Sequence, residues 1–440
     1  MKTDERRWET TVLSALISVN RRLDFRLASI LLVATIAFAA SPPTFNRDVL
    51  PILQKHCQVC HRPGEIAPMP LLSYQDARPW AKAIKAQVAT RKMPPWFADP
   101  AYGHFENERG LSEQDTRTIE TWVEAGAPEG EAKDKPAPIA WNEGWNIRPD
   151  AIFQMPDPYA VPARGTLDYL YIVIPTGFTK DTWVTAAEIR PGAPSVVHHA
   201  LAVVRPPGSE WLKEAKPFVP YMPPLEDAES ASQNDPQSKP VDMSYELLAA
   251  YSPGMGAQRF DIDRSAKLIP AGSDIILQVH YTPNGKMAMS DQTRVGVTLT
   301  GDRPPKRFYS AVAASANWTI APGDANAEGR ARLTFGEPVE LVSVQPHMHV
   351  RGKDMIVKLT YPDGRTETIL SVPRYDFHWQ IVYYLAKPLE LPQGTRVEAV
   401  AHWDNSANNA ANPDPSLTVK YGFQSTDEML SANMGVIVAQ

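Results

Sequence analysis

Short alternating runs of apolar and polar residues fill the chain beyond about residue 150. The runs are rich in valine, isoleucine, tyrosine and threonine, and prolines and glycines separate them, which is typical of all-β sandwiches. This part is long enough for two domains. We therefore predict two all-β, jelly-roll-like sandwich domains, over residues 150–300 and 301–440. The clearest predicted strands are Leu170–Val173, Val196–Val204, Ile275–Tyr281, Val339–Val344 and Val397–Ala401.

Residues 43–132 have a helical periodicity instead, and we predict a small all-α domain there. A second helix is expected over Ser73–Arg91. A third should begin at a capping box formed by Ser112 and Asp115 and end at Gly126. The apolar face of the first predicted helix consists of Val49, Leu50, Ile52 and Leu53.

The segments that flank this domain look non-globular. The apolar run Leu27–Ala40 follows three arginines and contains an Ala-Phe-Ala step, which is typical of a secretory signal. It is short for a membrane span, which needs ~20 residues. Residues 1–41 are therefore predicted to be a signal peptide or, alternatively, an uncleaved N-terminal anchor. Residues 133–149 are expected to be a linker, and Arg205–Lys239 a long surface loop.

Both cysteines of the chain lie in one pentapeptide, Cys57-Gln58-Val59-Cys60-His61. C-x-x-C-H is the attachment signature of a covalent c-type haem, with the histidine as an axial ligand of the iron. A zinc site would need further soft ligands, and the chain has no other cysteine. Three helices around this motif resemble a class I cytochrome c domain. Haem c attachment in bacteria requires export, so the motif agrees with the predicted signal.

A methionine or a histidine should be the sixth ligand of the haem iron. Met93 lies between the second and third predicted helices, where the resemblance to cytochrome c places the axial methionine, and two prolines follow it. Met69 is the competing ligand, only eight residues beyond His61. Either methionine could instead pack in the core. We expect Met93 to be the ligand.

Five of the ten histidines occur in settings that suit a metal. His347 and His349 stand at i and i+2 of an expected strand, so both imidazoles leave the same face. His198 and His199 are adjacent, and on a regular strand they would point to opposite faces. They can share a metal only at a bulge or a strand end. His280 lies on another expected strand.

Ser425–Met429 is a further expected strand. In chain order, this strand and the expected strands around these histidines resemble the copper type II, ascorbate-dependent monooxygenases. These are the peptidylglycine α-hydroxylating and dopamine β-monooxygenases, and the resemblance covers about residues 150–436. It implies two coppers, on two consecutive β-sandwiches, that face each other across an open cleft. The electron-transfer copper would be held by His198, His199 and His280. The oxygen-binding, catalytic copper would be held by His347, His349 and Met429.

The donor types are consistent with copper. A thioether is soft and favours Cu(I), whereas a three-imidazole site could equally hold zinc. The substrate side departs from the family, because Gln345 stands where the peptide-hydroxylating enzyme has a substrate-gripping arginine. Ser431 and Asn433 replace two further substrate contacts. His378 and His402 are expected to be structural, or alternatively to support metal ligands.

These observations predict a periplasmic or secreted monooxygenase that hydroxylates a C–H bond of a small or peptide-like organic substrate with O2. Electrons would enter from an external donor through the haem, with ascorbate or another reductant as a further source. The alternative is a non-catalytic haem- and copper-binding electron carrier. A net charge of −6 gives no reason to expect nucleic acid. Membrane contact is expected only through an uncleaved N-terminal segment.

Overall fold

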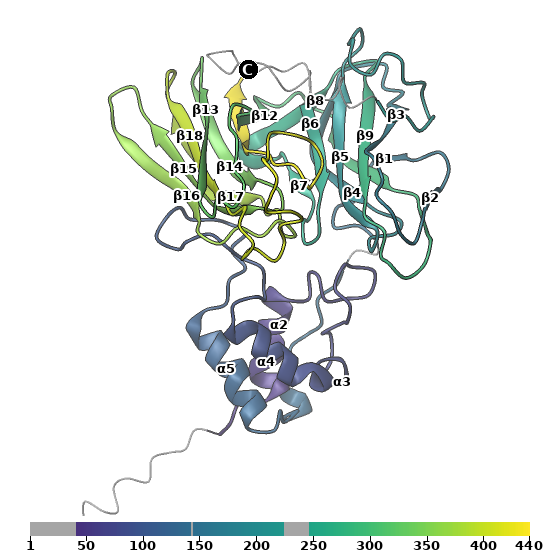
Figure 1. Ribbon diagram of the computed structural model, residues 1–440. Helices are drawn as coiled ribbons and strands as arrows, with labels where there is room; N and C mark the ends of the chain where they lie inside the picture. The colour runs from purple at the N-terminus through teal and green to yellow at the C-terminus, as the bar shows by residue number, and fades with distance from the viewer. Residues whose placement is uncertain (1–40, 142–143, 224–245) are drawn as a thin grey trace, which may run out of the picture.

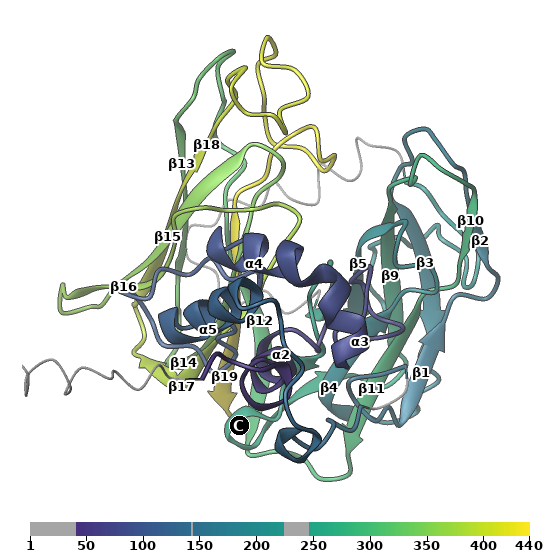
Figure 2. The same cartoon turned by 90° about the horizontal axis from the view of Figure 1, so that it is seen from below.

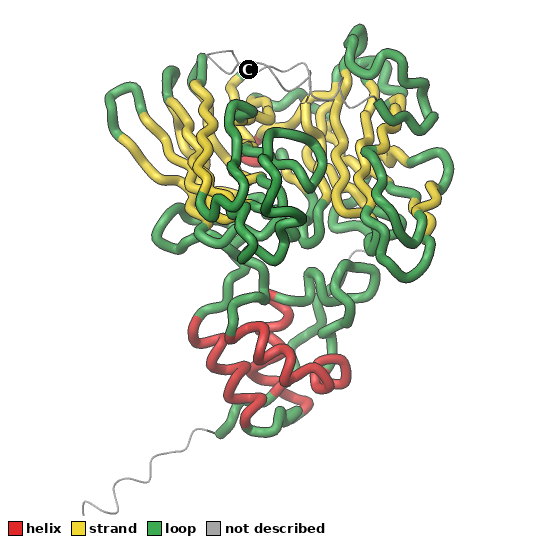
Figure 3. Tube along the Cα trace, in the orientation of Figure 1, coloured by secondary structure: helices red, strands yellow, loops and turns green. Residues whose placement is uncertain are grey.

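The computed structural model describes residues 41–141, 144–223 and 246–440, and it has two different parts (Figure 1). Short helices form a small N-terminal lobe, and strands joined by long loops form the remaining described chain (Figure 3). The predicted signal Leu27–Ala40 and the polar tract Glu226–Pro240 lie outside the described residues. No helix of the described part has the length and apolarity needed to cross a bilayer.

Four α-helices are found within residues 41–141, together with short π- and 3-10 turns. Burial of the predicted apolar face explains the first of them, and Ile119 and Trp122 anchor the longest. The backbone N–H of Asp115 donates to Ser112 Oγ at 3.0 Å, which confirms the predicted start of that helix. The elements are η1 (Phe45–Val49), α2 (Leu50–His56), α3 (Tyr74–Ala77), η2 (Arg78–Trp80), α4 (Ala81–Ala89), α5 (Glu113–Glu124) and η3 (Ala132–Asp134).

Nineteen strands and one 3-10 turn, η4 (Ile262–Arg264), make up the β part of the described chain. The five clearest predicted strands are confirmed as β3, β5, β9, β14 and β18. The strands are β1 (Ala151–Gln154), β2 (Tyr159–Val161), β3 (Leu170–Pro175), β4 (Thr182–Arg190), β5 (Val197–Arg205), β6 (Glu246–Tyr251), β7 (Gln258–Arg259), β8 (Ser265–Ile269), β9 (Asp274–Tyr281), β10 (Met289–Asp291), β11 (Arg294–Thr300), β12 (Lys306–Ala314), β13 (Ala327–Thr334), β14 (Val339–His347), β15 (Gly352–Thr360), β16 (Thr366–Val372), β17 (Tyr383–Leu391), β18 (Arg396–Trp403) and β19 (Ser431–Ala439).

One nine-stranded sheet runs through the whole β part, in the order β1-β11-β4-β8-β12-β19-β14-β17, with β7 beside β4. The four-stranded sheet β3-β9-β5-β6 covers its first half, and β13-β18-β15-β16 covers its second half. Strands β10 and β2 form a separate pair. Figure 2 shows these two four-stranded sheets on opposite sides of the molecule. Two clusters of buried apolar residues form the cores of the β part, one in each half.

The prediction of two separate sandwiches is therefore wrong, because a single sheet belongs to both halves. The halves join where β8 and β12 pair in parallel, Ser265 with Lys306 and Ala266 with Arg307. A parallel contact of two residues leaves no periodic signal in the sequence. At this seam Lys267 Nζ is fully buried, 3.4 Å from Glu246 Oε1.

The predicted all-α, cytochrome c-like domain over residues 43–132 is also wrong. Its helices are only 4 to 12 residues long, and the segment 96–107 leaves them to pack on the β part. Phe105 forms a β-bridge with Leu385, and its ring lies 5.3 Å from that of Tyr383. The prediction failed because a contact between distant parts of the chain is not visible in a local pattern. The apolar residues of segment 96–107, whose local pattern suggested a helical domain, are buried against β17.

A buried ionic network also fixes the helical lobe to the β part. Glu65 Oε1 accepts from Arg62 Nη2 at 2.8 Å and from Arg190 Nη2, on β4, at 2.9 Å. All three side chains are at most 15 % exposed, so this network is better shielded than a surface ion pair. Together with the Phe105 contact, it holds the lobe at two places on the β part.

Candidate functional site

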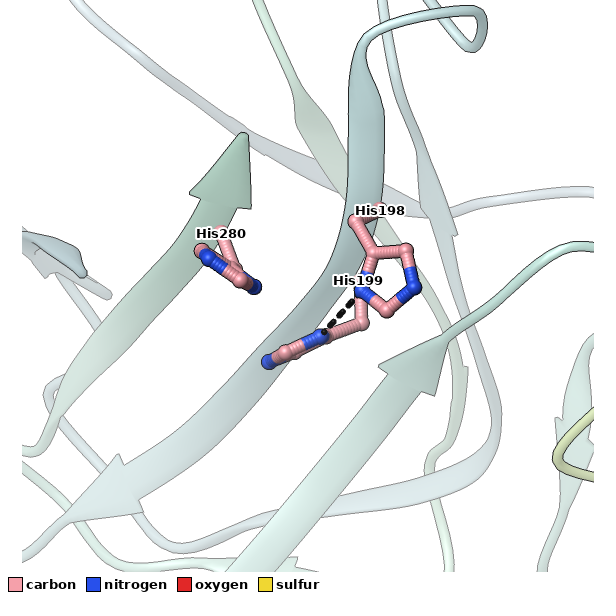
Figure 4. Close-up of side chains that lie close together, drawn as sticks. All are labelled: His198, His199 and His280. Carbon is pink, nitrogen blue, oxygen red and sulfur yellow. Dashed lines mark hydrogen bonds between the residues drawn. The ribbon is translucent and has the colours of Figure 1, made fainter. Parts of the chain in front are cut away.

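Three histidines on neighbouring strands converge in the first half of the β part (Figure 4). His198 and His199 lie on β5, and His280 lies opposite His199 on β9. The register shifts between Val197 and His199, so β5 has the bulge that the adjacent pair needs in order to turn both rings to one place. Their ligand nitrogens all lie within 4.8 Å of one another, and the Nδ1 atoms of His198 and His199 are 3.1 Å apart.

The electrostatics of this three-histidine cluster favour neutral imidazoles. Burial, with a smaller contribution from the neighbouring imidazoles, lowers the pKa of His198 to about 4 and that of His199 well below its ordinary value. Burial lowers the pKa of His280 to about 4 as well. Neutral imidazole is the form that binds metals. Buried His280 Nδ1 has no hydrogen-bond partner among the described residues, and a bound ion would satisfy such an atom.

Tyr169 supports the cluster from the loop before β3. Its ring stacks on that of His280, with centroids 4.6 Å apart and planes 16° apart. The phenol O–H donates to the carbonyl of Phe423, in the other half of the β part, at 2.5 Å. Tyr169 was not predicted, because an aromatic residue ahead of a strand is ordinary core composition and only the fold brings it to His280.

His347 is the last residue of β14 and His349 follows just beyond the strand, with ring centroids 5.3 Å apart. His347 Nδ1 is 2.8 Å from Gln380 Oε1, which fixes the ring and leaves Nε2 for a metal. His349 Nδ1 is buried and has no hydrogen-bond partner among the described residues. Burial lowers the pKa of both imidazoles. This pair therefore also fits a metal.

Met429 lies near this pair on the evidence of the backbone. His347 pairs with Ser431 on β19. The backbone N–H groups of His349 and Met429 both donate to Glu428 Oε2, at 2.8 and 3.4 Å. The predicted strand Ser425–Met429 is a turn instead, since β19 begins at Ser431. Met429 is partly buried.

The reason for that turn is the fully buried carboxylate of Glu428. It accepts hydrogen bonds from the backbone N–H groups of His349 at 2.8 Å and Arg351 at 2.6 Å, and from the indole of Trp403 at 3.0 Å. Burial raises its pKa to about 7, although these donors oppose the shift. Glu428 thus ties the backbone beside Met429 to the backbone of His349. Sequence analysis did not single it out.

Phe377 lies between the two histidine groups. Its buried ring is 4.8 Å from the ring of His198 and 5.7 Å from that of His349. The two groups are therefore neighbours that share one aromatic contact. Tyr375, from the same loop, donates its O–H to the carbonyl of Met348 at 2.8 Å and so holds the residue between the paired histidines.

A cavity of about 260 Å³ brings together the residues predicted to hold the haem. Cys57, Cys60, His61 and Met93 all line it. The two thiols are free, and burial raises their pKa, that of Cys57 to about 12. His61 Nδ1 is 3.1 Å from the carbonyl of Met69, which leaves Nε2 for an iron atom. Free paired thiols and an oriented imidazole fit a covalently attached haem.

Of the two competing methionines, only Met93 is among the residues that line this cavity, whereas Met69 contributes its backbone carbonyl. His56, expected on a helix surface, is buried and lines the cavity too. His104 is exposed in the segment that packs on β17. His402 is bound to Asp354 at 2.7 Å, as expected of a structural histidine.

Comparisons with known proteins identify no relative. No protein-family model and no curated protein matches the chain. Among solved structures, T=1 particles derived from infectious bursal virus match at 12% identity over 68% of this chain and 72% of theirs, with a TM-score of 0.18. A cryo-EM structure of broad bean stain virus matches at 6% identity over 65% and 92%, with a TM-score of 0.26. Major capsid protein P2 of bacteriophage PM2 matches at 8% identity over 58% and 98%, with a TM-score of 0.24. Such low scores establish neither fold nor function.

Replacing Gln380 by leucine tests the support given to His347. Loss of the 2.8 Å contact frees the imidazole, so copper affinity at the His347/His349 pair should fall by about ten- to a hundredfold. Competition with a chromophoric chelator measures this. Gln114→Leu, at an exposed position on α5, is the matched control. Equal affinities in the two variants would contradict the assignment.

Proposed function

We propose that this protein is an exported copper-dependent monooxygenase that hydroxylates a C–H bond of an organic substrate with O2. Electrons enter through a c-type haem attached at Cys57 and Cys60. The observation that carries the proposal is the convergence of His198, His199 and His280 beside a second histidine pair. The order and types of these ligands suggest kinship with the copper type II, ascorbate-dependent monooxygenases.

The chemistry of the donors supports copper at both places. His198, His199 and His280 supply three neutral imidazoles, which suit either oxidation state of copper. His347 and His349 with the thioether of Met429 form a softer set, which favours Cu(I) over zinc. Copper bound there supplies the redox chemistry with O2, while Gln380 and Glu428 hold the ligands in place. The aromatic ring of Phe377 lies between the two groups.

The substrate is expected to be a small or peptide-like organic molecule without the carboxylate grip of the peptide-hydroxylating enzymes. Gln345, at the position of that grip, donates through Nε2 to the carbonyl of Gln380 at 3.1 Å and is buried. The amide of Gln345 is therefore hydrogen-bonded to the backbone of Gln380, whose side chain orients His347. A neutral amide also has no bidentate partner for a carboxylate. A second reductant such as ascorbate remains part of the proposal.

Metal analysis and oxygen incorporation test the proposal together. We expect purified, copper-loaded protein to contain two copper ions per haem iron and to transfer ¹⁸O from ¹⁸O2 into small molecules of a periplasmic extract when ascorbate is present. Met429→Ala should abolish incorporation of ¹⁸O, because the two remaining imidazoles would hold copper without the soft thioether ligand. Met287→Ala, at an exposed methionine, is the control.

Absence of copper from the loaded protein would refute the proposal. Two coppers with haem–copper electron transfer but no incorporation of ¹⁸O would instead identify a non-catalytic electron carrier.

A further inference from the structure

The loop 373–382, between β16 and β17, reaches both the haem-attachment cavity and the histidine groups. His378 and Trp379 belong to the wall of the cavity that Cys57 and Cys60 also line. The preceding residue, Phe377, contacts the rings of His198 and His349 from the other side. Three consecutive residues of this loop therefore separate the cavity from the histidines.

Within this loop, His378 faces both neighbours. Its imidazole lines the cavity, and its ring centroid is 6.5 Å from that of His198, with the planes nearly perpendicular. His198 belongs to the three-histidine cluster. His378 is therefore the cavity-wall residue whose ring adjoins this cluster.

The loop is held firmly enough for this placement to persist. The backbone N–H of His378 donates to Asp376 Oδ1 at 2.9 Å, and that of Trp379 donates to the Asp376 carbonyl at 2.9 Å. The indole of Trp379 lies over Gly254, where an added Cβ would come within 2.6 Å of the ring. Gly254 has φ +80°, so the close approach and the backbone both require glycine.

We propose that His378 is the electron-transfer bridge between the haem and the three-histidine copper, an inference that rests on the proposed function. A haem held by Cys57, Cys60 and His61 would supply one electron on going from ferrous to ferric, and a copper held by His198, His199 and His280 would accept it on going from cupric to cuprous. No bond forms or breaks, and His378 itself keeps its oxidation state. Electron transfer through protein slows steeply with distance, so an aromatic side chain in the gap sets the rate.

Flash reduction of the haem in the full, haem- and copper-loaded protein tests the bridge without turnover. Under anaerobic conditions, absorbance follows the reoxidation of the haem as its electron moves to copper. We expect His378→Ala to slow this step by about tenfold or more, with unchanged copper content and haem spectrum. His378→Gln should slow it similarly, because it keeps polarity but removes the ring. His104→Ala, at an exposed histidine of the helical lobe, should match wild type.

The outcomes separate the bridge from the function on which it rests. Wild-type reoxidation rates in both His378 variants, with two coppers bound, would overturn the bridge and leave the monooxygenase proposal standing. Loss of the low-spin haem spectrum in His378→Ala would also overturn it, since His378 would then be an axial ligand. A wild-type protein that binds no copper would overturn the proposed function and the bridge with it.

Discussion

Replacing His199 by alanine is expected to abolish copper binding at the three-histidine cluster while the His347/His349 pair keeps its ion. The variant should therefore bind one copper per chain, and the thermal stabilisation that saturating copper gives to wild type should shrink. An ion present at about 100 times its dissociation constant stabilises the folded state by about 2.7 kcal/mol, and this contribution is lost with the site. Mass spectrometry of metal content and calorimetry with and without copper measure both effects.

The metal-free proteins provide the internal check. His199 is a neutral imidazole taken out of water, so its removal should cost the apo protein less stability than the holo protein. His402→Ala is the matched substitution, because this histidine lies on β18 and is bound to Asp354. Two coppers in His199→Ala would show that the cluster is not a metal site.

Replacing Lys267 by methionine is expected to lower the free energy of unfolding by about 3–5 kcal/mol. The substitution leaves the carboxylate of Glu246 buried at the seam between β8 and β12 without its nearest cation. The pKa of Glu246 is already raised by burial, with Lys267 opposing the shift. Without Lys267, the pKa should rise further, and the folded state will hold a proton that the unfolded chain releases near pH 4.5.

The sign of the pH dependence follows from that proton. Where the folded state binds more protons than the unfolded state, stability falls as pH rises. The loss of unfolding free energy caused by Lys267→Met should therefore be smaller at pH 5 than at pH 8. Urea unfolding followed by fluorescence measures this loss. Lys358→Met, at an exposed lysine on β15, should change the free energy of unfolding little at either pH. Adding Glu246→Leu should restore most of the lost stability, and a double variant as unstable as the single one would contradict the argument.

Local spacing predicted the parts of the site that local geometry determines. Cys57, Cys60 and His61 line one cavity because they are consecutive around a turn. The need for a bulge at His198 followed from the alternation of strand side chains, and β5 has that bulge. The strand containing His280 was also evident from its alternating valine and aromatic neighbours.

The predictions that failed concern residues whose positions depend on contacts between distant segments of the chain. Tyr169, Phe377 and Gln380 reach the histidines only because loops from different strands meet there, and their types resemble ordinary core residues. The segment 96–107 has apolar residues that suit a helical lobe but pack on β17. The turn at Glu428 was mistaken for a strand because nothing local indicates that a carboxylate will accept buried backbone donors.

The continuous nine-stranded sheet has a consequence for motion. The three-histidine cluster is carried by β5 and β9, and the second pair by β14, and these strands lie on opposite sides of the β8–β12 seam. The parallel pairing of two residues at that seam joins the described halves by backbone hydrogen bonds, which a hinge motion there would have to break. The spacing of the two histidine groups therefore depends on a continuous sheet rather than on a linker. Under the proposed function, we expect substrate to enter by movement of loops rather than by opening and closing of whole halves.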